Sequence, residues 1–413
     1  MIKKLFDRNM DYGLVIAVIA LMTIGVVMIH STSFGEHIDY PNFWIKQLLW
    51  SILSIFFILA VVLTPNKLFY SFSYVFYGLG IILLIITELY GSAGGGSIRW
   101  LKIGTVRFQP SEFMKIAVIL TLARYMSNRN NRPTTYVKCI VPFCIVLVPV
   151  VLIYMQPDLG TSLVFCSILL PMIYWAGLDK LRLFFLVAPL LSAILSAPFI
   201  PFFNWFTWVI FMFIILAVLC YSRYHFIGMG AILFTNIMAG IATPVVFSHL
   251  KPYHQKRITS VFNPEADALG AGWQIINSKI AIGSGGLFGK GIGKGRYTEL
   301  GFLPRSHNDF IFSVIGEELG LAGAVIVLTI IFFIVYRGIM IASEVKNSFM
   351  SVAAIGISTV IAFHMFVNVG MALGIMPVTG LPLPFLSYGG SSCISNAIMI
   401  GLLLNFSINR LEF

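Results

Sequence analysis

Residues 303–312, with the sequence LPRSHNDFIF, place a single acid, Asp309, directly before an apolar run. In a chain this hydrophobic, a carboxylate at the mouth of a membrane helix is costly unless it is solvated or paired. A carboxylate held there can accept a proton as a general base or coordinate a divalent cation. Asp309 is therefore the first candidate for a catalytic residue, and His307 is a candidate for a supporting role.

Two further acids follow prolines at the starts of predicted helices. Asp158, in the run QPDLGTS, comes directly after Pro157 and can cap the next helix by accepting hydrogen bonds from its first N–H groups. Glu112, in QPSEF, can do the same after Pro110, with Lys115 one turn further on as an ion-pair partner. Both acids are interpreted as structural or supporting residues.

Glu317 and Glu318 follow Asp309 within the same apolar stretch. On one continuous helix they would lie about 12 Å from Asp309, at 1.5 Å per residue. Acids that deep in a membrane need partners, and proton-coupled transporters also use such acids. A buried structural pair and a functional role both remain open for them.

The segment from about 248 to 308 is strongly basic, and so is the segment 91–109. Cations near a bilayer attract anions, either anionic lipids or the head group of an anionic substrate. Because two basic segments are predicted on the same face of the membrane, binding of an anionic substrate head group is favoured over contact with anionic lipids. The cations of these two segments that are candidates for binding it are Arg99, Arg257, Lys279 and Lys290.

The run GSGGLFGKGIGKG at 283–295 is rich in glycine. Its backbone N–H groups could converge on phosphate oxygens, with Lys290 and Lys294 adding charge. It is not a Walker P-loop, because no Ser or Thr follows either GK pair. A flexible hinge is the alternative. Just before it, residues 271–282 are apolar but too short to span a membrane, which predicts an interfacial or re-entrant helix.

The composition excludes a soluble domain. The chain has 413 residues, of which 58% are hydrophobic and 10% charged, and its mean hydropathy is +0.92. Repeated apolar stretches of about 20 residues are typical of an all-α polytopic membrane protein. The five cysteines lie in or beside apolar runs, which predicts neither a disulfide framework nor a zinc site. The first apolar run lacks a cleavage site and is interpreted as a retained span.

Twelve transmembrane helices are predicted, with both termini on the cytoplasmic side because most Lys and Arg outside 248–308 fall on the side of the N-terminus. This orientation places 91–109 and 248–308 outside. The predicted spans cover residues 12–32, 45–64, 69–90, 110–127, 138–155, 160–177, 181–199, 204–222, 226–247, 309–336, 350–373 and 388–408.

Several long motifs resemble the SEDS family (shape, elongation, division and sporulation), and its elongation branch more than its division branch. The resemblance covers most of the chain. The motifs are RWLKIGTVRFQPSEFMK at 99–115, QPDLGTS at 156–162, NPEADALGAGWQIINSKIAIGSGGLFGKG at 263–291, DFIFSVIGEELG at 309–320 and NVGMALGIMPVTGLPLPFLSYGGSS at 368–392.

The resemblance implies one membrane domain over residues 1–413, with a peptidoglycan glycosyltransferase activity that polymerises lipid II at the outer face of the bacterial cytoplasmic membrane. The family's catalytic aspartate matches Asp309. Its Arg–Trp motif, its Glu–Lys pair and its pre-loop arginine match further positions. These are Arg99 and Trp100, Glu112 and Lys115, and Arg257, of which Trp100 and Lys115 are further candidates for substrate binding.

The chain departs from the family pattern in three places. The family usually reads LPE-x-HTDF, whereas here Arg305 replaces the acid and Asn308 replaces the threonine. The GTQ that commonly follows the glycine-rich run is GRY at 295–297. Residues 204–247 hold two apolar segments beyond the family's ten-span plan, which we interpret as a two-span insertion.

The chemistry expected from this resemblance needs one carboxylate and several cations. Asp309 would deprotonate the attacking hydroxyl, or bind a Mg or Mn ion that activates it, while cations hold the diphosphate leaving group. A flippase for a lipid-linked precursor and a non-catalytic scaffold are the alternatives. The partners implied are a class B penicillin-binding protein, lipid II and other elongation-complex membrane proteins, with no nucleic acid.

Overall fold

The computed structural model describes residues 10–33, 42–94, 97–104, 106–197, 205–222, 226–250, 255–256, 259–267, 270–303 and 306–411. The chain forms two compact units, one of residues 1–177 and 277–413 and one of residues 178–276. Arg257 and Arg305, two of the cations predicted for the basic loop, lie outside the described residues.

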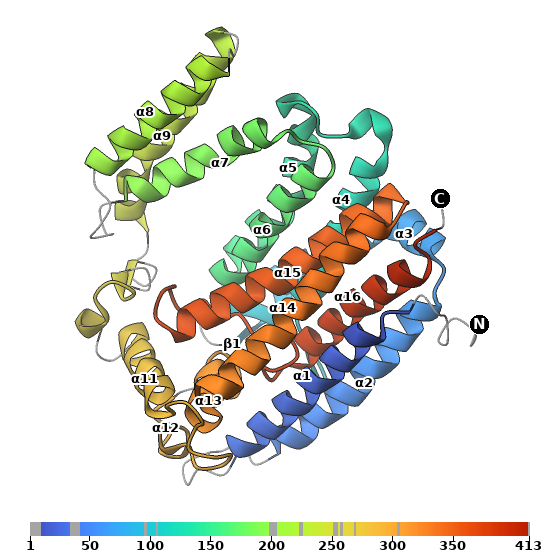
Figure 1. Cartoon of the computed structure of the whole chain (residues 1–413), viewed down its shortest axis with the longest axis vertical. Helices are drawn as coiled ribbons and strands as arrows, with labels where there is room; N and C mark the ends of the chain where they lie inside the picture. Colours follow the sequence, from blue (N-terminus) through green and yellow to red (C-terminus); the bar gives the residue numbers. More distant parts are fainter. Residues whose placement is uncertain are drawn as a thin grey trace. The chain divides into compact units, whose positions relative to one another are not determined.

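The first unit is a helical bundle built around three buried helices (Figure 1). Most of α4, α15 and α16 is buried, and α15 contacts both α4 and α16. The more exposed helices pack around them, with α2 against α16, α14 against α15, α3 against α4 and α5 against α6. The bounds are α1 Tyr12–Ser31, α2 Phe43–Leu63, α3 Asn66–Tyr90, α4 Pro110–Ser127, α5 Tyr136–Met155, α6 Leu159–Trp175, α14 Gly320–Glu344, α15 Ser348–Ala372 and α16 Gly390–Ile408.

The exposed surface of these helices is apolar, as expected for helices that face lipid. Eight helices among the described residues are long and apolar enough to cross a membrane, and α6 and α8 (Trp205–Tyr221) are shorter apolar helices. Only 17% of the span window in α3 is buried, against 83% in α16, so α3 lies at the periphery of the bundle. The predicted class, an α-helical membrane protein, is confirmed, whereas the count of twelve spans stays a prediction.

The predicted single span over 309–336 is wrong, because the helix is interrupted before Gly320. A short helix, α13, covers Ile311–Glu318, and α14 starts a new helix at Gly320. Gly320 has a φ of +68°, and a Cβ added there would lie 2.3 Å from the backbone nitrogen of Gly289. The close approach of residues 287–289 explains the break, because only glycine fits such a contact in the left-handed region. Glu317 and Glu318 therefore end a short helix and do not lie within a long one.

A small antiparallel sheet interrupts the helical fold between α3 and α4. Its strands are β1 Ser92–Gly94, β2 Ser97–Ile103 and β3 Val106–Phe108, in the order β1-β2-β3. Leu101 pairs with Phe108 and Lys102 with Arg107 across the hairpin. The basic segment 91–109, predicted as a loop, is thus ordered mainly by strand pairing, and Arg99 and Trp100 lie on its central strand.

The basic loop contains one longer helix, α11, at Ala271–Ser284. This confirms the predicted helix over 271–282. Ser278 anchors its second half through contacts of 2.6 Å each to the Ser313 hydroxyl and the Ala372 carbonyl. Shorter turns, η3 at Pro264–Asp267 and α12 at Arg296–Glu299, occupy the rest of the basic loop that the structure describes. Whether α11 lies at the membrane interface stays a prediction.

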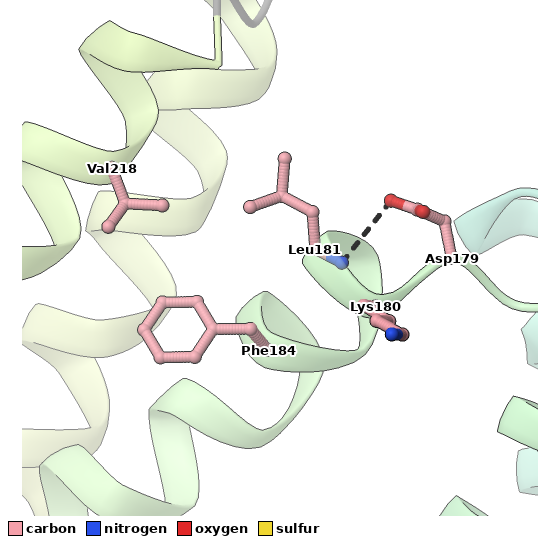
Figure 2. A pocket seen from close by; sticks show the side chains of 5 residues that line it. All are labelled: Asp179, Lys180, Leu181, Phe184 and Val218. Atoms are coloured by element: carbon pink, nitrogen blue, oxygen red, sulfur yellow. Dashed lines mark hydrogen bonds between the residues drawn. The ribbon is translucent and has the colours of Figure 1, made fainter.

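The second unit contains α7 (Lys180–Leu195), α8 and α9 (Phe226–His249). Phe185, Ala188, Ile215 and Leu219 form its apolar core. A shallow pocket between α7 and α8 is lined by Asp179, Lys180, Leu181, Phe184 and Val218 (Figure 2). Asp179 caps α7 by accepting a hydrogen bond of 3.2 Å from the Leu181 N–H, so the acid at this pocket has a structural role. The interpretation of α8 and α9 as an inserted pair stays a prediction.

Candidate active site

Asp309 lies in the turn that precedes α13, and its side chain is partly exposed. Beside it runs segment 377–388, which follows α15. Gly380 in this segment has a φ of +73°, and a Cβ added there would lie 3.4 Å from Asp309 Oδ2. The carboxylate therefore faces a glycine backbone, where any side chain would touch it and strain the chain.

Hydrogen bonds fix the backbone around Asp309. The Asn368 amide, on α15, donates to the carbonyl of Asp309 at 2.9 Å and to the carbonyl of Leu381 at 2.8 Å. The Ser387 hydroxyl donates to the carbonyl of Asn308 at 2.7 Å. Segment 377–388 and the Asp309 turn are therefore joined at several points, and Asp309 as a residue is only partly buried.

Aromatic rings pack beside this turn. The Tyr388 N–H donates to the His307 carbonyl at 2.9 Å, and the Tyr388 ring stacks on Phe43 of α2 with centroids 4.5 Å apart. His307 meets the same Phe43 ring edge-on at 5.0 Å. His307 thus lies in an aromatic cluster next to Asp309.

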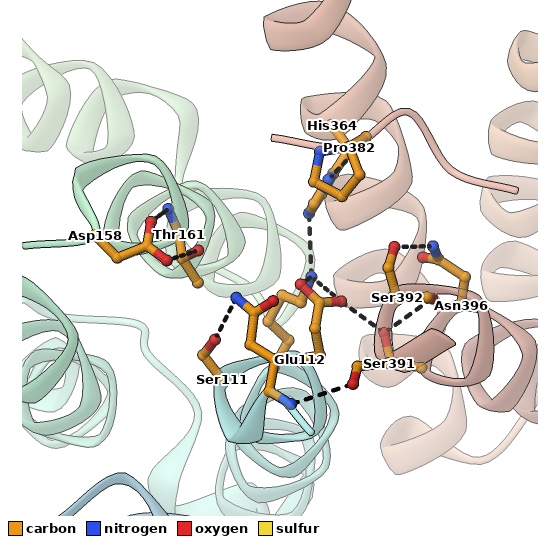
Figure 3. A network of polar contacts seen from close by, with 12 residues as sticks. Ser111, Glu112, Asp158, Thr161, His364, Pro382, Ser391, Ser392 and Asn396 are labelled. Atoms are coloured by element: carbon orange, nitrogen blue, oxygen red, sulfur yellow. Dashed lines mark hydrogen bonds and ion pairs between the residues drawn. The ribbon is translucent and has the colours of Figure 1, made fainter. Parts of the chain in front are cut away.

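A second group of polar side chains is buried between α4, α15 and α16 (Figure 3). Lys115 Nζ lies 2.9 Å from each Glu112 oxygen, which confirms the predicted ion pair. It also lies 3.2 Å from His364 Nε2, and the Ser395 hydroxyl donates to Glu112 at 2.9 Å. Glu112 does not cap α4 as predicted, because its carboxylate is bound to these side chains and the helix has no side-chain cap. Lys115 is only 1% exposed, and its predicted contact with substrate stays a prediction.

Asp158 lies apart from this group, at the start of α6 (Figure 3). Its carboxylate accepts from the Thr161 N–H at 3.1 Å and from the Thr161 hydroxyl at 2.9 Å, which confirms the predicted cap. Arg99 Nη1 lies 3.2 Å from the same carboxylate. A Cβ added at Gly160 would lie 2.8 Å from the Thr379 carbonyl, so the Arg99–Asp158 pair lies near segment 377–388. Thr379 directly precedes the glycine that faces Asp309, so this segment connects the two groups.

Glu317 is fully buried at the end of α13 and is bound by the glycine-rich run. Lys290 Nζ donates to its carboxylate at 2.7 Å, and the Tyr297 N–H donates to the same oxygen at 3.2 Å. The Lys290 N–H also donates to the main-chain carbonyl of Glu317 at 3.1 Å.

Glu318 is bound in the same way from the other side. Its carboxylate accepts hydrogen bonds from the Ser31 hydroxyl of α1 and from the Gly293 N–H, the latter at 3.3 Å. The Gly291 N–H donates to its main-chain carbonyl at 3.0 Å. A Cβ added at Gly289 would lie 2.1 Å from this carbonyl.

The glycine-rich run is predicted to be either a phosphate-binding loop or a flexible hinge, and these contacts bear on that choice. Three of its backbone N–H groups, those of Lys290, Gly291 and Gly293, and the ammonium group of Lys290 are bound to Glu317 and Glu318, so these donors are already occupied. This arrangement favours a structural role for the acid pair. Lys279, by contrast, has an exposed side chain on α11.

The divalent cation expected at Asp309 stays a prediction. Within the described part of the chain, no group of three or more His, Cys, Asp or Glu side chains could hold a metal. Mg²⁺ is often held by one or two carboxylates together with substrate phosphates and water.

Several residues at this site have no counterpart among the residues predicted from the sequence. His364 and Asn368 lie four residues apart, on one face of α15, and both bind carbonyls of segment 377–388. Gln47 of α2 accepts a hydrogen bond from the Gly389 N–H at 3.3 Å. Polar residues at an i, i+4 spacing in an otherwise apolar helix are the signal that could have identified the first two.

Comparisons with known proteins agree with this fold and its motifs. Residues 12–204 and 202–412 match the family of cell cycle proteins that includes FtsW, RodA and SpoVE. The chain is similar to the peptidoglycan glycosyltransferase RodA of Treponema pallidum (strain Nichols), with 34% identity over 98% of each chain. It is also similar to the peptidoglycan glycosyltransferase MrdB of Escherichia coli (strain K12), with 34% identity over 99% of this chain and 96% of that one.

Solved structures show the same architecture. One chain, from a study of how a peptidoglycan synthase complex coordinates polymerization and crosslinking, has a TM-score of 0.73 and 25% identity over 98% of this chain and 99% of that one. The rod shape determining protein RodA of Thermus thermophilus has a TM-score of 0.64 and 24% identity over 98% of both chains. The chain thus belongs to the FtsW, RodA and SpoVE family of cell cycle proteins, the SEDS family that its motifs resemble.

Proposed function

We propose that this protein is a peptidoglycan glycosyltransferase that polymerises lipid II into glycan strands during cell elongation. The observation that carries the proposal is the setting of Asp309, whose carboxylate is partly exposed while its backbone is held by Asn368. A base must be accessible to substrate and fixed in position, and Asp309 meets both conditions. The full-length similarity to proteins named peptidoglycan glycosyltransferase supports the same reaction.

The reaction is a displacement at the anomeric carbon of the lipid-linked donor. The 4-hydroxyl of the acceptor sugar forms the new C–O bond, and Asp309 takes the proton that this hydroxyl loses. The bond between the anomeric carbon and the diphosphate breaks, and the polyprenyl diphosphate leaves with the electron pair. One displacement inverts the anomeric centre. A diphosphate needs no general acid, in contrast to the alkoxide that leaves in glycoside hydrolysis.

Cations must neutralise the charge that develops on the leaving diphosphate. Arg99 suits this role because its side chain is 19% exposed and its partner Asp158 lies near Thr379. The residue after Thr379 is Gly380, which faces Asp309. The exposed Lys279 and the basic loop residue Arg257 are further candidates. Arg99 is paired with the buried Asp158, as Lys115 and Lys290 are paired with Glu112 and Glu317, so each of these cations would exchange its acid partner to bind a substrate.

A Mg or Mn ion held by Asp309 and the substrate would supply further charge neutralisation at the diphosphate. We also infer that both termini are cytoplasmic and that the site faces outward, as the distribution of Lys and Arg predicts. A class B penicillin-binding protein is the partner we expect. The related chain from a peptidoglycan synthase complex supports such a partner, because that complex couples polymerization to crosslinking.

The flippase alternative depends on a functional role for Glu317 and Glu318. A transporter would need these acids to exchange protons or partners during its cycle. Their carboxylates are instead bound by Lys290, Ser31 and the main-chain N–H groups of Gly293 and Tyr297, a pattern typical of a structural pair.

One experiment separates the two functions. The purified full-length protein, alone and with its cognate class B penicillin-binding protein, is reconstituted in liposomes with fluorescent lipid II. Polymer and translocated lipid II are measured for the wild type, Asp309→Asn and the double variant Glu317→Gln/Glu318→Gln. The proposal predicts polymer from the wild type and none from folded Asp309→Asn. Translocation without polymer, lost in the double variant and kept in Asp309→Asn, would overturn it.

A further inference from the structure

His364 lies buried near the middle of α15, between two groups that the proposed reaction treats separately. Its Nε2 atom lies 3.2 Å from Lys115 Nζ, in the buried group with Glu112. Its Nδ1 atom lies 3.0 Å from the carbonyl oxygen of Pro382, in segment 377–388 (Figure 3). The imidazole therefore bridges a buried ion pair and the segment that faces Asp309.

The partners of the two ring nitrogens determine where the proton lies. Lys115 is held by both oxygens of Glu112 and is an ammonium group, which can only donate. His364 Nε2 must therefore accept from Lys115, and an imidazolium would set an N–H against an N–H. The proton lies on Nδ1, which donates to the Pro382 carbonyl, a group that can only accept. The buried ion pair thus fixes the tautomer that holds Pro382.

Segment 377–388 has no regular secondary structure, and three of its twelve residues lack a backbone donor, so side-chain bonds contribute to its position. Pro377, Pro382 and Pro384 lack an N–H group, so they cannot form regular backbone hydrogen bonds as donors. His364 and Asn368, one turn apart on α15, bind the consecutive carbonyls of residues 381 and 382. The same Asn368 amide also binds the Asp309 carbonyl.

The path from His364 to the reacting carboxylate is therefore short. Pro382 lies two residues from Gly380, which is the backbone that faces Asp309 Oδ2. If the Pro382 carbonyl loses its donor, the segment can shift, and the space beside Asp309 changes with it. Misplacement of a catalytic group by about 1 Å can cost about 100-fold in rate.

We propose that His364 is a positioning residue for the polymerisation reaction: its Nδ1–H holds Pro382, and through segment 377–388 it keeps Asp309 aligned with the acceptor hydroxyl. His364 does not touch the reacting atoms and exchanges no proton with them. This role rests on the proposed function, in which Asp309 acts on lipid II.

Two substitutions separate the two ends of the ring. In His364→Asn, the side-chain amide nitrogen takes the place of Nδ1 and keeps a donor for Pro382, while the acceptor for Lys115 is lost. In His364→Gln, the terminal oxygen takes the place of Nε2 and keeps the acceptor for Lys115, while the donor for Pro382 is lost. His249→Gln, at an exposed histidine of α9, is the control.

The measurement is the rate of polymerisation of fluorescent lipid II by the full-length protein with its cognate penicillin-binding protein, together with Tm. We expect His364→Gln to lower kcat by about 10-fold to 100-fold with little change in KM. His364→Asn should stay within a few-fold of the wild type, and its pH–rate profile should keep the wild-type shape. A merely structural histidine would predict equal losses of rate that follow the losses of Tm.

The inference is overturned if His364→Gln keeps the wild-type kcat, if both variants lose rate equally, or if the loss appears only in KM. Asp309→Asn is assayed in the same series. Activity retained in Asp309→Asn would remove Asp309, and with it the positioning role of His364, from the mechanism, whereas no polymer from the wild type would refute the proposed function itself. An inactive Asp309→Asn beside a fully active His364→Gln would refute only the positioning role.

Discussion

Replacement of Lys115 by Met should destabilise the fold strongly, because it leaves a carboxylate buried without its cation. Glu112 is 3% exposed and Lys115 is 1% exposed. The ammonium group supplies hydrogen bonds of 2.9 Å to both Glu112 oxygens. After the substitution, the Ser395 hydroxyl remains as a donor to Glu112, but it carries no compensating charge.

The size of the effect follows from the burial of the pair. Loss of one partner from a buried ion pair costs about 3–5 kcal/mol in the free energy of unfolding. Glu112→Gln in the same chain removes the stranded charge, so the double variant Glu112→Gln/Lys115→Met should recover about 2 kcal/mol or more. The coupling between the two positions is the quantity that the structure predicts.

The assay is equilibrium unfolding of the purified protein in mixed detergent micelles, with each single variant, the double variant and a control. Arg410→Met is the control, because Arg410 and Glu344 form an ion pair of 3.1 Å whose side chains are 39% and 38% exposed. Its loss should cost less than about 1 kcal/mol. The reasoning would be refuted if Lys115→Met were as stable as Arg410→Met. It would also be refuted if the changes in the free energy of unfolding of Glu112→Gln and Lys115→Met simply added up in the double variant. An accompanying rise in KM for lipid II would then favour Lys115 as a substrate contact.

Three further predictions concern the groups around the site. Gly289→Ala should destabilise the fold, because its φ is +77° and the new Cβ would lie 2.1 Å from the Glu318 carbonyl, whereas Gly283→Ala, which meets nothing within 4 Å, should be neutral in the same unfolding assay. Glu318→Gln should weaken the hold on the glycine-rich run, so hydrogen exchange over residues 286–297 should speed up; unchanged exchange would contradict the structural role of the acid. Asn368→Ala should lower Tm, because two carbonyls lose their donor, and should also lower kcat by about 10-fold or more, because the Asp309 turn is no longer fixed; a wild-type kcat would contradict this.

Local signals in the sequence explain which elements could be predicted. The bounds of α4 follow from Pro110, which suits the first turn of a helix, and from the apolar run that ends at Ser127. The break at Gly320 could not be predicted in this way, because the left-handed conformation is set by the backbone of residues 287–289, some 30 positions earlier. The strand Ser97–Ile103 was missed although it is followed by Gly104, a glycine with a φ of +62° in the hairpin turn.

The same distinction holds for the site. The Glu112–Lys115 pair and the cap formed by Asp158 depend on spacing within one helix, and spacing is visible in the sequence. The roles of His364 and Asn368 depend on carbonyls of a loop that returns to α15 only in the folded protein. Main-chain acceptors have no sequence signature, so such contacts appear only in the structure.

The most direct test of the account is a comparison of binding and chemistry in Asp309→Asn. Lipid II binding, Tm and the single-turnover rate of polymerisation are measured for the wild type and the variant, each in complex with the cognate penicillin-binding protein. The account predicts equal Tm and binding within a few-fold, with a rate at least about 100-fold lower, because only the proton acceptor is removed. An Asp309→Asn variant that polymerises lipid II at the wild-type rate would contradict it.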